Sequence, residues 1–257
     1  MSVNVNAKAK VLDKGSIELL EVFGNDLTVV NAARVSFAKE SSEFKEGDGK
    51  LIKYLASHGH ISPFFHPQIR LRVKMPIFVA REWYRHTVGF ARNEVSRRYV
   101  DSDVELYQPN EEEIRERDAN KKQGSKETPV ENSMTAYSVI KEINEKAEEA
   151  YVYLLHLKVA PELARTVLPQ GMYTEFIETG SLAAYARLCN LRLDPAAQLE
   201  IRLYADAVKS LLVEKFPVSW GALMHDETEE KKPSEASQTD KPLQQSQQVT
   251  VDLSTGC

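Results

Sequence analysis

The chain has 257 residues, a hydrophobic fraction of 42% and a formal net charge of −5. This composition supports a sizeable core and excludes a chain that is disordered throughout. The longest apolar run, residues 75–80, is too short to cross a bilayer, and two cysteines are too few for a disulfide framework or a cysteine-based zinc site. We therefore expect a cytoplasmic protein with no membrane partner.

The first clear element is a strand followed by a helix. Residues 67–74 alternate between apolar and basic side chains, a pattern that predicts a half-buried strand with Ile69, Leu71 and Val73 on its inner face. Pro76 suits the first position of a helix, which we expect to run to about His86.

A compact basic cluster follows, over residues 81–98. It holds five arginines and two glutamates, a local net charge of 5 − 2 = +3, namely Arg81, Arg85, Arg92, Arg97 and Arg98 with Glu82 and Glu94. Guanidinium groups suit bidentate binding of phosphate. A solvated polar helix face is the alternative for Arg81 and Arg85. The cluster is compact, and residues 1–224 as a whole carry a net charge near zero. The cluster therefore favours binding of a mononucleotide over binding of a nucleic acid.

The later elements are mostly helical. Residues 110–132 are polar and predict a surface insertion, residues 133–157 an amphipathic helix, and residues 172–179 a strand. Asp194 and Pro195 predict the start of a further helix that stops at Pro217. The apolar residues expected to face the core are Ile140, Ile143, Ala147, Ala150, Tyr151 and Leu154 in the first helix, and Leu199, Leu203, Ala207 and Leu211 in the second.

Together these elements predict an α+β fold with long helices in one domain, residues 1–224. The remaining residues, 225–257, are rich in Glu, Lys, Ser, Thr and Gln, with a net charge of 3 − 7 = −4. We expect them to form an acidic, polar and disordered tail.

Four segments occur in the order found in a known enzyme family. Arg85-His86, then Asn-Glu-Val-Ser at 93–96, then Arg-Tyr at 98–99, resembles the signature of the flavin-dependent thymidylate synthases (ThyX type). His-Gly-His-Ile-Ser-Pro-Phe at 58–64 resembles a family turn, and residues 164–169 and 190–192 resemble two further family segments. The chain departs from the family at Thr87, which is usually Arg, at Ser-Leu-Ala in place of Asn-Ala-Arg at 181–183, and at Arg187 in place of Asn.

The resemblance implies a single domain with an antiparallel sheet and long helices. It also implies FAD-dependent methylation of dUMP to dTMP, with methylenetetrahydrofolate as one-carbon donor and NADPH as reductant, in a homotetramer with shared active sites. Arg192 would be catalytic, favouring the ionised uracil ring. By matching position, the dUMP contacts would be Glu82, Arg85, Glu94, Ser96, Arg97, Arg98, Arg165 and Arg192. The flavin contacts would be Ser62, Arg85, His86, Thr87, Glu94 and Arg187. Arg92, Arg97 and Arg187 are candidates for replacing the arginines that the family has and this chain lacks.

Two other functions stay open at this point. One is a nucleotide- or RNA-binding protein of the same fold without flavin chemistry; the other is a flavoenzyme that modifies another pyrimidine nucleotide. We expect no nucleic-acid partner. We also expect no metal, because the histidines at 58, 60 and 66 have no nearby cysteine or carboxylate that would complete a set of metal ligands. Flavin chemistry requires no thiol nucleophile, so Cys189 is not needed as a catalytic residue. We expect it in the core.

Overall fold

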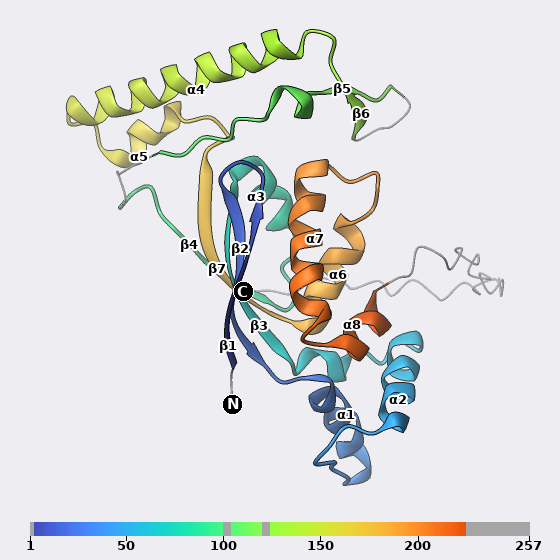
Figure 1. Cartoon of the computed structure of the whole chain (residues 1–257). Helices are drawn as coiled ribbons and strands as arrows, with labels where there is room; N and C mark the ends of the chain where they lie inside the picture. The colour runs from blue at the N-terminus through green and yellow to red at the C-terminus, as the bar shows by residue number, and fades with distance from the viewer. Residues whose placement is uncertain (1–2, 100–103, 120–123, 225–257) are drawn as a thin grey trace, which may run out of the picture. The chain divides into compact units, whose positions relative to one another are not determined.

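The structure is a computed structural model that describes residues 3–99, 104–119 and 124–224 (Figure 1). A five-stranded antiparallel sheet forms its centre, in the order β1-β2-β3-β7-β4. The strands are β1 (Val3–Val11), β2 (Gly15–Phe23), β3 (Gln68–Pro76), β4 (Phe90–Glu94) and β7 (Tyr173–Ser181), and a separate hairpin joins β5 (Arg115–Arg117) to β6 (Ser125–Pro129). This confirms the α+β fold with an antiparallel sheet. The predicted tail, residues 225–257, lies outside the described residues.

Strand β3 confirms the pattern of residues 67–74. Ile69, Leu71 and Val73 are fully buried on one face of the sheet. The basic residues between them lie on the other face, where Arg70 pairs with Glu21, Arg72 with Glu18 and Glu175, and Lys74 with Glu105. Acidic residues of the same chain therefore neutralise the basic face of this strand.

Helices α3 (Ile77–Trp83), α6 (Leu182–Arg192) and α7 (Leu199–Val213) pack on the sheet. Helices α1 (Asp26–Arg34), α2 (Glu46–Ser57) and α8 (Pro217–Leu223) pack on one another, and α8 also packs on α6 and α7. Figure 1 shows α6 and α7 beside the sheet, and Trp83, Tyr185, Tyr204 and Trp220 fill the core. Asp26 accepts hydrogen bonds from the backbone N–H of Val218 (3.0 Å) and Ser219 (2.8 Å). This carboxylate therefore ties α1 to the start of α8.

Two sequence predictions are wrong in detail around α3 and α7. Helix α3 ends at Trp83 rather than at His86, and the chain then turns through Gly89, whose φ is +82°, to form β4, a strand that the sequence pattern does not reveal. Helix α7 begins at Leu199, because Asp194 caps a separate turn through the N–H of Ala196 at 2.7 Å. Helix α7 ends at Val213, before Pro217, and Pro217 begins α8.

The buried face of α7 also differs from the predicted stripe. The residues that face the core are Ile201, Tyr204, Ala205, Val208 and Leu212, whereas Leu203 is exposed. The Tyr204 hydroxyl donates to the backbone carbonyl of Lys74 at 2.8 Å. This contact with β3 sets the rotation of the helix about its axis.

The long helix predicted over 133–157 is present as α4 (Ser133–His156), but only Tyr151 in it is buried. It packs on α5 (Pro161–Ala164) and on the short 3-10 helices η3 (Glu111–Glu113) and η4 (Arg165–Val167). Ile143, expected in the core, is 54% exposed, because the core of this chain does not cover that side of the helix. Within the described ranges, no helix is both long and apolar enough to span a membrane.

Candidate active site

The ends of α3 and α6 meet at a bonded cluster around Arg192, the last residue of α6. Its Nε donates to His86 Nε2 at 2.9 Å, and its two terminal nitrogens donate to the Glu82 carboxylate and the Glu82 backbone carbonyl, each at 3.0 Å. A guanidinium has five N–H groups, so 5 − 3 = 2 remain for a ligand. The structure therefore holds Arg192 in one orientation and leaves it two donors.

A cavity of about 550 Å³ lies next to this cluster. Its lining residues come from the end of α3, the end of α6, the β5–β6 hairpin and the start of α7, and are Glu82, Arg85, Arg115, Gly124, Ser125, Arg192, Ala197, Gln198 and Glu200. The segment predicted as a surface insertion thus contributes one wall of the candidate site.

The sequence analysis missed the residues of that wall. Arg115 donates to Glu200 and to Ser125 Oγ, each at 2.7 Å, and Gln198 donates to the other Glu200 carboxylate oxygen at 2.8 Å. These residues lie in a polar stretch and at a helix start, where charged side chains are ordinary. No local pattern distinguishes them, since only the folded chain brings them opposite Arg192.

His86 is a buried and uncharged member of the cluster. Burial and the nearby positive charges of Arg192, Arg187, Arg92 and Arg85 lower its pKa to about 4. An imidazole that accepts a hydrogen bond from Arg192 at Nε2 carries no proton on that nitrogen. His86 therefore acts as a neutral acceptor that holds the arginine.

This assignment predicts a pH dependence of stability. Between pH 4 and pH 6.5 the unfolded chain binds a proton on His86 that the folded chain does not bind, so the free energy of unfolding rises with pH across this window. We expect the His86→Gln variant to show a shallower rise. Chemical denaturation of both proteins at several values between pH 4 and pH 7 measures the two slopes, and equal slopes would contradict the assignment.

The residues expected to bind flavin lie on three converging segments. Arg187 of α6 donates to the backbone carbonyl of Val88 at 2.5 Å. A Cβ on Gly89 would lie 3.0 Å from Ala184 and 3.5 Å from the ring of Phe65, which belongs to η2 (Ser62–Phe65). The segments that carry Ser62, Thr87 and Arg187 are thus packed together.

These segments fit a dinucleotide. The side chains of Ser62, Thr87 and Arg187 are exposed, and together they offer hydroxyl donors and a cation suited to a pyrophosphate. Residues 181–183, which replace the family's Asn-Ala-Arg, are buried, and Ser181 caps α6 through the N–H of Ala184 at 3.2 Å. Of the three candidate replacements for the missing arginines, Arg187 is the nearest in sequence to residues 181–183.

Five candidate residues do not line this cavity. Ser96 Oγ accepts from the backbone and the Nε of Arg98 at 3.3 and 3.2 Å, and Arg165 Nε donates to the Glu162 carbonyl at 3.3 Å. Glu94 accepts from Thr174 at 2.6 Å. None of these residues, nor Arg97, is among the described residues that line the cavity. The cavity of one chain thus brings together part of the predicted dUMP contacts, namely Glu82, Arg85 and Arg192.

Cys189 and Arg92 are held inside the protein to different degrees, since Cys189 is buried and Arg92 is partly buried. Cys189 is completely buried, as expected, and burial raises the pKa of its thiol. Arg92, a candidate replacement for a missing arginine, forms an ion pair with the buried Glu178. Its guanidinium group is therefore already paired with a carboxylate of the same chain.

Comparisons with known proteins match most of the chain to one family. Residues 18–218 match the family model described as thymidylate synthase complementing protein. The flavin-dependent thymidylate synthase of Kosmotoga olearia is 42% identical over 217 residues, covering 84% of this chain and 93% of the relative. That of Thermus thermophilus is 40% identical over 212 residues, covering 82% and 76%. The chain belongs to the flavin-dependent thymidylate synthase family.

A solved structure extends the comparison to a bound nucleotide analogue. The crystal structure of the UMP/dUMP methylase PolB from Streptomyces cacaoi, bound with 5-Br dUMP, superimposes with a TM-score of 0.74 at 28% identity. The match covers 83% of this chain and 96% of PolB. The flavin-dependent thymidylate synthase fold thus extends over nearly the whole described chain.

Proposed function

We propose that this chain is a cytoplasmic, FAD-dependent thymidylate synthase that methylates dUMP to dTMP, with methylenetetrahydrofolate as one-carbon donor and NADPH as reductant. The observation that carries the proposal is Arg192, which three hydrogen bonds hold at the wall of a polar cavity with two N–H groups to spare. Reduced FAD, when bound, supplies the hydride.

In this proposal the chain's own residues bind the pyrimidine and stabilise its charge. The two remaining N–H groups of Arg192 donate to the uracil edge and stabilise the negative charge that develops on the ring. Glu82 and His86 keep the guanidinium oriented, while Arg85 adds positive charge to the same cavity. The Cys189 thiol is buried, so it does not serve as a nucleophile in this scheme.

The remaining residue assignments form part of the proposal. Residues 1–224 would be the catalytic domain, with Arg97, Arg98, Arg165, Ser96 and Glu94 completing the dUMP site. Ser62, Arg85, His86, Thr87, Glu94 and Arg187 would hold the flavin. Because Ser96, Arg97, Arg98 and Arg165 do not line the cavity of Arg192 within one chain, we propose that each active site of a homotetramer combines residues from different subunits.

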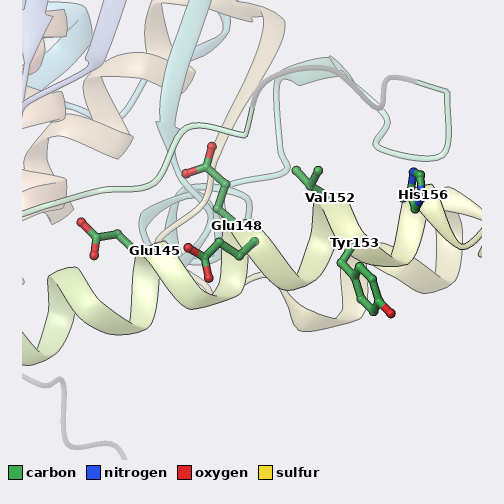
Figure 2. Close-up of a pocket in the computed structure, with 6 residues that line it drawn as sticks. Glu145, Glu148, Val152, Tyr153 and His156 are labelled. Carbon is green, nitrogen blue, oxygen red and sulfur yellow. The ribbon is translucent and has the colours of Figure 1, made fainter.

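The exposed face of α4 supports association between copies of the chain. Val139, Ile143 and Tyr153 of α4, and Leu157 directly after it, are all more than half exposed. A hollow on the same helix is lined by Glu145, Glu148, Glu149, Val152, Tyr153 and His156 (Figure 2). Exposed apolar rows of this kind are typical of protein contacts.

Disrupting this row tests the shared active site. We expect the Val139→Arg/Ile143→Arg variant to dissociate and to lose most of its dUMP-methylating activity, because single chains would lack half of each site. Gel filtration with light scattering, run beside the activity assay, measures both effects. Lys141→Ala, on an exposed position between them, is the control. A fully active monomer would contradict the shared site.

The absorption spectrum of the purified protein tests the proposed chemistry. We expect an oxidised-flavin band that changes when dUMP is added, and dTMP as product when methylenetetrahydrofolate and NADPH are supplied. A colourless protein that binds nucleotide would instead support a binding module without flavin chemistry. Because the structurally similar PolB is a UMP/dUMP methylase, UMP should be assayed in parallel; turnover of UMP without dTMP formation would reassign the substrate.

A further inference from the structure

Glu178 is a buried carboxylate in the middle of β7 that the proposed chemistry does not use. It is fully buried and occupies an inward position between Phe176 and Gly180, where the alternation of a strand favours apolar residues. A buried charge is costly unless it is paired and hydrogen-bonded. Arg92 forms an ion pair with Glu178, and the Trp83 indole N–H lies 3.2 Å from each carboxylate oxygen.

The two partners belong to the two segments that carry candidate site residues. Trp83 is the last residue of α3 and directly follows Glu82, with Arg85 two residues further on. Arg92 lies opposite Glu178 in the pairing of β4 with β7, two residues before Glu94. One carboxylate therefore ties both the end of α3 and the middle of β4 to β7.

Side-chain contacts add to the backbone pairing that holds strand β4 against β7. It is a five-residue strand at the edge of the sheet and pairs only with β7 among the named strands. The guanidinium carbon of Arg92 lies 4.8 Å from the ring centre of Phe90 and 5.5 Å from that of Tyr84. The planar group thus contacts one ring from β4 and another from Tyr84, the residue that follows α3.

We propose that Arg92 and Glu178 are positioning residues that set the spacing between the end of α3 and β4. They thereby hold Glu82 and Arg85 on one segment, and Glu94 on the other, in the places from which each completes an active site. A role in stability alone is disfavoured, because an apolar pair of similar volume is often at least as stabilising as a buried ion pair. The kinetic part of this inference rests on the proposed function.

The test compares full-length, FAD-loaded variants with the wild-type protein. In Arg92→Met/Glu178→Met both charges are replaced by apolar groups, and we expect a melting temperature near that of the wild type. We expect kcat/KM for dUMP to fall by about 10- to 100-fold, because small displacements of binding groups have effects of this size. Hydrogen exchange of the backbone amides in residues 90–95, measured by mass spectrometry, should become faster.

Glu175→Gln is the matched control, because Glu175 is an exposed, ion-paired glutamate on the other face of β7; it should behave as the wild type. Wild-type kcat/KM and wild-type exchange in the double variant would overturn the inference. If the double variant does not fold, the Arg92→Lys variant tests the inference, since it keeps the charge and loses the planar group. A reduced kcat/KM at an unchanged melting temperature supports positioning. An unchanged kcat/KM overturns it. If the wild type does not methylate dUMP, the proposed function fails while the exchange comparison still tests the pair.

Discussion

Replacing Arg192 with lysine is expected to lower kcat for dUMP methylation by about 100- to 1,000-fold, the usual effect of removing one preorganised donor from an anion-stabilising site. An ammonium group is a compact charge and cannot reproduce three fixed bonds together with two further donors in one plane. We expect the Kd of dUMP to change much less than kcat. Steady-state kinetics and nucleotide titration of the flavin spectrum measure the two quantities separately.

Arg81→Lys is the matched control for this variant. Arg81 is an exposed arginine of α3 that does not line the cavity, so its replacement should leave kcat unchanged. Normal turnover by Arg192→Lys would show that the planar guanidinium is not required, and the role assigned to Arg192 would be wrong.

Replacing Arg98 with alanine is expected to weaken dUMP binding by about 10- to 100-fold, because a hydrogen bond to a charged group contributes about 1.5–3 kcal/mol. Ser96 already lies within hydrogen-bonding distance of the Arg98 side chain, so the pair presents a hydroxyl and a guanidinium together to a phosphate. At saturating dUMP we expect kcat to fall far less than in the Arg192 variant. Titration calorimetry with dUMP measures the loss directly.

Arg117→Ala serves as the control, because Arg117 is an exposed arginine of the β5–β6 hairpin outside the proposed phosphate site. An unchanged affinity in Arg98→Ala, or an equal loss in both variants, would remove Arg98 from the site. Added salt should weaken binding by the wild type more than by Arg98→Ala, since the lost contact is between charges.

Features that depend on neighbours along the chain can be predicted from the amino-acid sequence. The alternation of Ile69, Leu71 and Val73 predicts β3, because side chains of a strand alternate between its faces whatever the strand packs against. The resemblance of the segments around Arg85, Ser96 and Arg192 to a known family likewise depends only on the order and spacing of residues. It predicts the family that the comparisons show.

Which of these residues meet depends on how the chain folds. Helix α7 turns Tyr204 rather than Leu203 to the core, because the sheet and α6 surround it on that side. Arg115 reaches the cavity through a hairpin 77 positions before Arg192 in the chain (192 − 115 = 77). Glu178 is tolerated on an inward position of β7 because Arg92 and Trp83 arrive there from two other segments. Such contacts join groups far apart in sequence, so no local periodicity records them, and packing and the pairing of buried charge select them only once the chain has folded.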